Sequence, residues 1–212
     1  MYHKFSEFYL SYLVQHFSGL NLTRITNPDE FYEKQVLDSV YPFENYKNLS
    51  ELVSKTGLFV DVGFGGGFPI LPLRELIDDD VKFFGIDSRK KKVDAVNSIS
   101  KSYNQKNIYF IHNRLESVYF NEPAFVTFKA VGDVSKMLKL FKGVRGSYIL
   151  FYKAKNFESL EPNFKVNNGF KFIEMKKYNI GENERSYVLF EKINNCPKNK
   201  SLVNLSEFVF NN

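Results

Sequence analysis

The fold of this chain is decided by the stretch Asp61-Val62-Gly63-Phe64-Gly65-Gly66-Gly67-Phe68-Pro69. It follows the apolar run Leu58 to Val62, which predicts a strand, and it opens a segment that predicts a helix. A glycine-rich turn in this place lets the backbone approach a ligand at the carboxyl edge of a parallel sheet. Four glycines within five positions are costly in backbone entropy for a plain turn, which favours a ligand-binding loop over a tight turn without a ligand.

The spacing of the glycines, Gly-x-Gly-x-Gly, limits the class of ligand. A dinucleotide fingerprint needs a third glycine at Gly-x-Gly-x-x-Gly, where this chain has Phe68 counted from Gly63 and Ile70 counted from Gly65. A P-loop needs Gly-Lys-Ser/Thr, and here Gly67 is followed by Phe68. NAD and nucleoside triphosphates are therefore disfavoured, which leaves a ligand with a nucleoside and no pyrophosphate, such as S-adenosylmethionine.

A carboxylate ends the second expected strand. Asp87 lies 24 residues beyond Gly63, where a carboxylate can accept hydrogen bonds from both hydroxyls of a ribose. The alternative is an N-terminal cap on the helix that begins near Ser88. Because the loop and Asp87 fall at the same edge of the sheet, we expect them to bind the cofactor together.

After Gly57, short apolar runs alternate with polar helical segments, which is typical of a parallel α/β sheet buried on both faces. We expect a Rossmann-like α/β fold with seven strands, mostly parallel. The last two strands are separated only by the turn Asn179 to Glu184, so they should form an antiparallel hairpin. The expected strands are Leu58 to Val62, Val81 to Ile86, Ile108 to His112, Phe125 to Phe128, Tyr148 to Tyr152, Phe170 to Lys177 and Tyr187 to Glu191, with helices at about Phe68 to Ile77, Arg89 to Tyr103, Asp133 to Phe141 and after Asn156.

Three parts are expected along the chain. Residues 1–56 should form a helical N-terminal extension, residues 57–192 the Rossmann-like domain, and residues 193–212 a flexible tail with at most a helical turn near Leu202 to Phe210. The expected helices of the extension are an amphipathic one from Phe5 to Phe17 that stops before Gly19, a second at about Asp29 to Val40 begun by Asn27 and Pro28, and a third at about Leu49 to Ser54.

Composition excludes several classes of protein. In 212 residues, 43% are hydrophobic and 25% charged, which is ordinary globular usage and excludes long disordered or collagen-like chains. The single cysteine, Cys196, cannot form an intrachain disulfide, and no thiolate set for zinc exists. Apolar runs are too short for a membrane span, and polar residues interrupt the first of them, so we expect a cytoplasmic protein with no membrane and no metal.

Positive charge is concentrated in the middle of the chain. The formal net charge is +5, and the stretch Lys129 to Lys155 holds seven cations against one anion, Asp133. Such a stretch is often only a solvated lysine face, but it also fits a surface that binds the phosphates of a nucleic acid.

Several short motifs follow one another between roughly residues 21 and 192. They are Asn21-Leu22-Thr23, Leu37-Asp38-Ser39, Asp61 to Leu73, Asp87-Ser88 with Lys91, Arg114-x-Glu116, Lys129-Ala130, Lys153 and Glu184-Arg185. Together they resemble the RsmG/GidB family of bacterial 16S rRNA guanine-N7 methyltransferases. The resemblance implies the fold of class I S-adenosylmethionine-dependent methyltransferases and methylation of N7 of one guanine in 16S rRNA, as free RNA or in the small ribosomal subunit. Monomer is the default oligomeric state.

Four positions depart from the family pattern. Gln35 replaces a usual histidine, Ile70 a glycine, Lys129 an arginine and Ala154 a glycine. Lysine keeps the charge at position 129 but lacks the planar fork of arginine, so a contact there would change in geometry. The departures therefore bear on the substrate more than on the cofactor.

The loop, the strand ends and the resemblance together define the expected site. No residue is assigned a catalytic proton transfer, since N7 of guanine carries a lone pair and no proton and can attack the sulfonium methyl directly. The expected cofactor-binding residues are Asp61, Gly63, Gly65, Gly67, Phe68, Asp87, Asn113, Arg114, Leu115 and Lys129, and the expected RNA-binding residues are Arg89, Lys91, Lys129, Lys153 and Arg185.

Two alternatives remain open from the residues alone. A methyltransferase acting on a small molecule or a protein would share every cofactor residue. An RNA-binding module with a decayed cofactor pocket would explain the departures at Gln35, Ile70 and Lys129.

Overall fold

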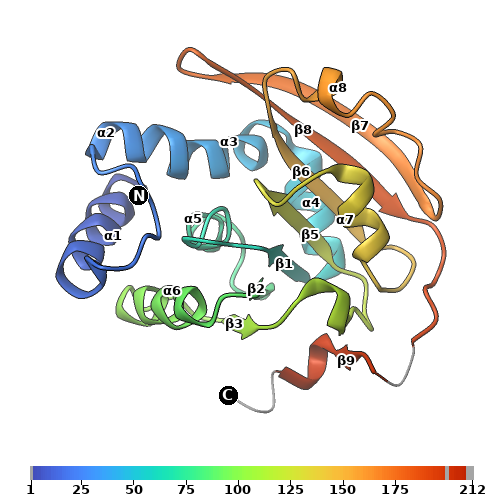
Figure 1. Cartoon of the computed structure of the whole chain (residues 1–212), viewed down its shortest axis with the longest axis horizontal. Helices are drawn as coiled ribbons and strands as arrows, with labels where there is room; N and C mark the ends of the chain where they lie inside the picture. The colour runs from blue at the N-terminus through green and yellow to red at the C-terminus, as the bar shows by residue number, and fades with distance from the viewer. Residues whose placement is uncertain (1, 199–200, 209–212) are drawn as a thin grey trace.

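The computed structural model describes residues 2–198 and 201–208, as an α/β sheet with a helical N-terminal extension (Figure 1). The strands are β1 (Leu58–Val62), β2 (Lys82–Asp87), β3 (Ile108–His112), β4 (Val118–Tyr119), β5 (Phe125–Lys129), β6 (Tyr148–Ala154), β7 (Phe170–Ile180), β8 (Asn183–Lys192) and β9 (Val203–Asn204). The helices are α1 (Tyr2–Phe17), α2 (Pro28–Phe31), η1 (Tyr32–Leu37), α3 (Asp38–Asn45), α4 (Lys47–Thr56), α5 (Ile70–Arg74), α6 (Lys90–Ser102), η2 (Leu115–Ser117), α7 (Val134–Leu140), α8 (Phe157–Leu160) and η3 (Leu205–Phe208).

Seven strands form the main sheet in the order β3-β2-β1-β5-β6-β8-β7. Neighbouring strands from β3 to β6 pair in parallel, whereas β8 pairs antiparallel with both β6 and β7. This confirms the expected Rossmann-like fold with its antiparallel C-terminal hairpin. The parallel register brings the last residues of β1, β2, β5 and β6 to one edge of the sheet, where the glycine loop begins.

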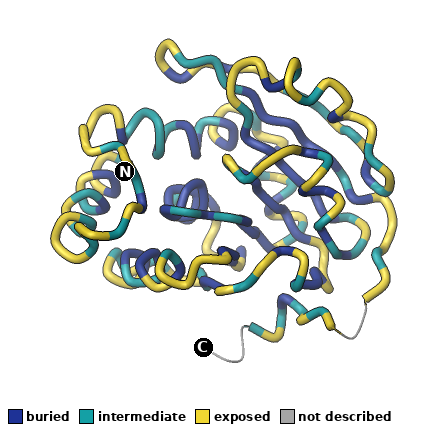
Figure 2. The backbone as a smooth tube through the Cα atoms, in the orientation of Figure 1, coloured by how far each residue is buried: buried dark blue, intermediate teal, exposed yellow. Residues whose placement is uncertain are grey.

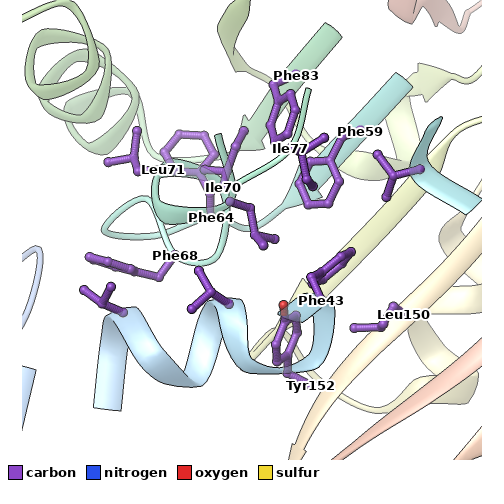
Figure 3. Packing of buried hydrophobic residues seen from close by; sticks show 14 of the residues in the cluster. Phe43, Phe59, Phe64, Phe68, Ile70, Leu71, Ile77, Phe83, Leu150 and Tyr152 are labelled. Atoms are coloured by element: carbon purple, nitrogen blue, oxygen red, sulfur yellow. The ribbon is translucent and has the colours of Figure 1, made fainter. Parts of the chain in front are cut away.

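Alternate residues of each central strand enter two different hydrophobic cores. In β1, Phe59 packs with the N-terminal helices, α5 and α6, whereas Val60 packs with α7, α8 and the tail residue Leu205. Figure 2 shows the central strands buried along their length, and Figure 3 shows Phe59, Phe83 and Phe43 meeting on the side of the extension. Continuous apolar strands are required because both faces are covered.

The extension is more continuous than the sequence predicts. The expected helix from Asp29 to Val40 instead runs through α2, η1 and α3 to Asn45, and η1 is a π-helical segment. Its start is as expected, because the side chain of Asn27 accepts a hydrogen bond from the Glu30 N–H and Pro28 occupies the first turn. By contrast, α5 is shorter than expected, since Pro69 and Pro72 have no N–H to donate and the chain continues beyond Arg74 in turns.

The C-terminal hairpin is longer than predicted and contacts the extension at its tip. β7 continues to Ile180 and β8 begins at Asn183. This leaves a two-residue turn in place of the longer turn, Asn179 to Glu184, that the sequence predicts. Gly181 has a φ of 54°, and Asn183 donates a hydrogen bond to Glu33 of η1 at 3.2 Å. The hairpin thus closes over the helical extension.

The described residues of the C-terminal tail contact the body of the protein. The N–H of Cys196 donates to the Gly143 carbonyl, Leu205 is buried, and β9 pairs in parallel with β4, a small sheet that the sequence did not predict. The expected helical turn near Leu202 to Phe210 is observed as η3, and residues 209–210 lie outside the described residues. Across residues 2–198 and 201–208, no helix is both long and apolar enough to cross a membrane.

Packing at Gly67 gives a test of this arrangement. A Cβ at this position would lie 2.5 Å from a methyl carbon of Leu71 and 3.1 Å from Val96, at a φ of 90°. We expect Gly67→Ala to lower the free energy of unfolding by about 3 kcal/mol, through overpacking and left-handed strain. Urea denaturation would measure it.

The matched control is Gly19→Ala, because no atom of the described residues lies within 4 Å of a Cβ there and φ is ordinary. We expect the control to change stability by about 0.5 kcal/mol or less. Equal stability of the two variants would contradict the packing of the loop against α5 and α6.

Candidate active site

A cavity of about 570 Å³ opens at the carboxyl edge of the sheet, over the glycine loop. Its wall includes the ends of β1 and β2, the start of α6 and the segment after β5. Of the residues expected to bind the cofactor or RNA, those that line it are Gly63, Gly65, Phe68, Asp87, Arg89, Asn113, Arg114, Leu115 and Lys129. The fold therefore brings together most of the expected cofactor residues, although they come from four different strand ends.

Asp87 lies in the floor of this cavity, and hydrogen bonds fix its carboxylate. One oxygen accepts the Gly65 N–H at 3.0 Å and the other accepts the Arg89 N–H at 2.8 Å. The second bond closes the turn before α6, but the N-cap of this helix is Arg89 and has no side-chain cap hydrogen bond, so Asp87 is not its N-cap. A carboxylate has about four lone-pair positions, which leaves acceptors for a ligand.

The N-terminal extension holds the glycine loop from the opposite side. The hydroxyl of Tyr9 donates to the Gly66 carbonyl at 2.8 Å, and a Cβ on Gly66 would lie 2.8 Å from the Leu22 carbonyl oxygen. Leu22, Lys34 and Gln35 also line the cavity. No sequence signal distinguishes Tyr9 from the other aromatic residues of the amphipathic helix.

Asp61 supports the loop from beneath and does not line the cavity, which differs from its expected place among the cofactor residues. It is fully buried and accepts hydrogen bonds from the Thr127 hydroxyl at 2.9 Å and the Ile70 N–H at 3.3 Å. Burial raises the pKa of this carboxyl to about 7. Gly67 is likewise absent from the cavity wall, because its position is required by packing on Leu71.

A second cavity of about 280 Å³ adjoins the first, and its lining includes three of the expected cations, Lys129, Lys153 and Arg185. The segment Lys129, Ala130 and Val131 lines both cavities. Lys153 and Arg185 line only the second one, and both are paired within the protein, Lys153 with Glu161 and Arg185 with Asp38.

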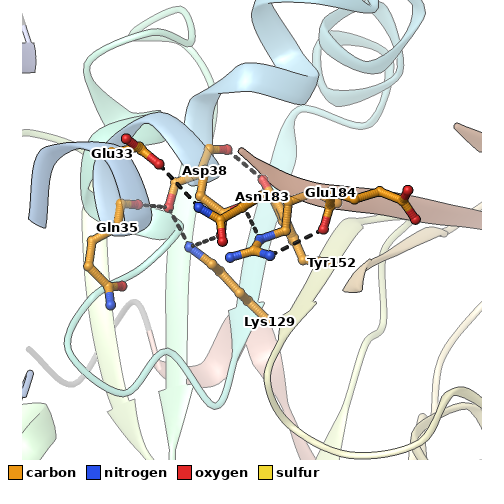
Figure 4. A network of polar contacts seen from close by, with 9 residues as sticks. Glu33, Gln35, Asp38, Lys129, Tyr152, Asn183 and Glu184 are labelled. Atoms are coloured by element: carbon orange, nitrogen blue, oxygen red, sulfur yellow. Dashed lines mark hydrogen bonds and ion pairs between the residues drawn. The ribbon is translucent and has the colours of Figure 1, made fainter. Parts of the chain in front are cut away.

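The carboxylate of Asp38 joins two of these cations. Its Oδ2 lies 2.9 Å from Lys129 Nζ, and its Oδ1 accepts a hydrogen bond from Arg185 Nε at 3.2 Å (Figure 4). Asp38 belongs to α3, so this buried group links the extension to the ends of β5 and β8. The sequence indicated Asp38 only as part of a family motif, and its place between two cations follows from tertiary structure.

The other expected RNA-binding residues lie at the start of α6. Arg89 and Lys91 are exposed, and of the two only Arg89 lines the first cavity. Lys92, which the sequence analysis did not select, lines it as well. In residues 2–198 and 201–208, no three His, Cys, Asp or Glu side chains gather as a metal site would require.

Three departures from the family pattern have different surroundings. Ile70 is fully buried in the core beneath the loop, so the fold accommodates its side chain without using the cavity. Gln35 lines the first cavity, and Ala154 is exposed and lines the second. The departures at Gln35, Lys129 and Ala154 therefore lie where a substrate would be contacted.

Comparison with known proteins adds to this geometry. The profile of the GidB family, described as rRNA small subunit methyltransferase G, matches residues 2–186. The chain belongs to this family. The match extends through the helical extension as well as the sheet, so the contacts of α1 and α3 with the site belong to the matched region.

Relatives and solved structures agree with this family. Ribosomal RNA small subunit methyltransferase G of Aliarcobacter butzleri is 32% identical, over 75% of this chain and 78% of its own length. That of Prochlorococcus marinus strain MIT 9215 is 31% identical, over 84% and 79%. A SAM-dependent methyltransferase from Aquifex aeolicus has the same fold, with a TM-score of 0.50 and 15% identity over 72% of this chain and 91% of that one.

The position of Asp87 predicts its effect on cofactor binding. We expect Asp87→Ala to weaken binding of S-adenosylmethionine by about 1.5–3 kcal/mol, the range for hydrogen bonds to a charged group. Calorimetric titration would measure the dissociation constant. Asp94→Ala is the control, since Asp94 is an exposed partner of Lys90 on the same helix. An unchanged dissociation constant in Asp87→Ala would remove Asp87 from the site.

Burial of Asp61 predicts a pH dependence of stability. Its pKa is raised from 3.8 to about 7, so the folded state binds a proton that the unfolded state has lost, and stability falls as pH rises from about 4 to 7. Asparagine cannot ionise; its Oδ1 can accept from the Ile70 N–H, and its Nδ2 can donate to the Thr127 hydroxyl oxygen. We expect the stability of Asp61→Asn relative to the natural chain to rise by about 3 kcal/mol between pH 4.5 and 7.5. Denaturation at pH 4.5 and 7.5 would measure it, and a constant difference would contradict a protonated Asp61.

Proposed function

We propose that this protein transfers a methyl group from S-adenosylmethionine to N7 of one guanine in 16S rRNA. The observation that carries the proposal is the first cavity, where the glycine loop and Asp87 meet in a chain of the rRNA small subunit methyltransferase G family. The fold and family support the cofactor, and the atom that is methylated is our inference.

The residues of the first cavity suit this cofactor. The Asp87 carboxylate is oriented by two backbone donors and has acceptor positions left for ribose hydroxyls. Leu115 and Met137 offer apolar surface for an adenine ring, and Asn113 lies beside them in the wall. S-adenosylmethionine supplies an electrophilic methyl group on a sulfonium when it is bound there.

The chain's own contribution to the reaction is positioning. N7 of guanine carries an in-plane lone pair and no proton, so no side chain has to act as a general base. Alignment of two bound reactants can lower a barrier by roughly 7–11 kcal/mol. We assign this alignment to the loop, which Tyr9 and Asp61 hold from two sides.

Exposed cations at the start of α6 are the proposed contacts with RNA phosphates. Arg89 and Lys91 are exposed beside the first cavity, whereas Lys129, Lys153 and Arg185 are engaged in ion pairs and act closer to the acceptor nucleotide. A monomeric enzyme is part of this proposal. Ribosomal RNA as the substrate supports a cytoplasmic location.

Methyl transfer to small-subunit RNA tests the proposal. We expect label from S-adenosylmethionine at a single guanine of 16S rRNA taken from cells that lack this protein, presented as free RNA and as subunits. Chemical mapping of N7-methylguanine would locate the site, with large-subunit RNA as the control.

Other outcomes of this assay select the alternatives. Cofactor binding without label in either form of the RNA would favour a small molecule or a protein as the methyl acceptor. Absence of both label and cofactor binding would favour an RNA-binding module with a decayed pocket.

A further inference from the structure

The second cavity is placed where a methyl acceptor has to be. It shares Lys129, Ala130 and Val131 with the first cavity, so a group bound in one lies against the same wall as a group bound in the other. Reacting atoms must approach to roughly 3–3.5 Å for transfer. If the first cavity holds the methyl donor, this wall is where the acceptor atom must come close to it.

The polar groups at this cavity form a defined pattern. The Asp38 carboxylate is a hydrogen-bond acceptor, and 2.9 Å away the Lys129 ammonium is a hydrogen-bond donor. Both residues line the cavity. Guanine presents the complement, because its O6 accepts hydrogen bonds while the adjacent N1–H and the N2 amino group donate them. Adenine presents the opposite order, with a donating N6 amino group beside an accepting N1.

We propose that the second cavity holds the acceptor guanine, with Asp38 accepting from N1–H and the N2 amino group and Lys129 donating to O6. This inference rests on the proposed function and names the residues that select the base. N7 is next to O6 on the purine, so a base held in this way directs N7 toward the side of Lys129. That side is the wall shared with the first cavity.

Asp38 is fixed well enough to recognise a base. Its side chain is 8% exposed and is held by Lys129 and Arg185, which use one lone-pair position on each oxygen and leave two others. The neighbouring backbone is fixed too, because the Tyr152 hydroxyl donates to the Ser39 carbonyl at 2.6 Å. A carboxylate with little freedom loses little entropy when it binds a base.

Replacement of the methylated guanosine by inosine tests the contact without changing the protein. Inosine keeps N7, O6 and N1–H and lacks only the N2 amino group. With inosine ligated into the RNA at the mapped position, we expect kcat/KM to fall about tenfold, the effect of one lost hydrogen bond to a charged group. Equal rates for guanosine and inosine would overturn the inference and leave the proposed function intact.

The variant Asp38→Asn completes a double-mutant cycle. We expect it to methylate guanosine more slowly, to bind S-adenosylmethionine within twofold of the natural chain, and to show no additional loss with inosine. A role of Asp38 in folding alone would slow both substrates and preserve the tenfold ratio, which would overturn the inference. Asp79→Asn, an exposed carboxylate paired with Arg74, is the matched control and should keep the natural ratio.

The remaining outcomes are also decisive. Asp38→Asn is judged not to fold if it loses cofactor binding. In that case the inference is decided by the natural chain alone, from the ratio of its kcat/KM values for guanosine and inosine. If the natural chain methylates no guanine in either form of the RNA, the proposed function fails and this inference fails with it.

Discussion

The structure of the site depends on how closely the backbone of the glycine loop is packed from both sides. Gly66 leaves no room for a side chain beside the Leu22 carbonyl, and Gly67 leaves none beside Leu71 and Val96. The loop is thus held between the N-terminal extension and the first helices of the sheet. Glycine is needed in this loop for two reasons: neighbouring atoms leave no room for a side chain, and a ligand has to approach the backbone. The extension is therefore a structural part of the cofactor cavity.

A second constraint is electrostatic and lies at the second cavity. A buried carboxylate needs partners, and Asp38 has two cations, Lys129 from β5 and Arg185 from β8. These pairs hold α3 over the carboxyl edge of the sheet. Removal of Asp38 would leave both cations without this counter-charge, so the pairs explain why these lysine and arginine side chains do not project into solvent as simple phosphate contacts.

Both constraints suit a reaction that needs geometry more than proton transfer. In the reaction that we propose, a lone pair on N7 and a methyl on sulfur have only to be held in line, and we place them at the wall from Lys129 to Val131 that the two adjoining cavities share. Asp61, whose pKa is raised by burial, lies beneath the loop and lines neither cavity. Its hydrogen bonds to Ile70 and Thr127 support the loop.

The sequence by itself determined the class of fold, the position of the loop and the place of Asp87, because apolar runs and glycine spacing are local consequences of strand burial and tight turns. It also led to the family, through motifs spread from Asn21 to Arg185. Only the tertiary structure decided that Asp61 and Gly67 support the loop from outside the cavity, that Lys153 and Arg185 are paired, and that Asp38 faces Lys129. The contacts of Asp61 with Thr127 and of Asp38 with Arg185 join residues 66 and 147 positions apart, and no local pattern records which distant side chains will meet when the extension folds onto the sheet.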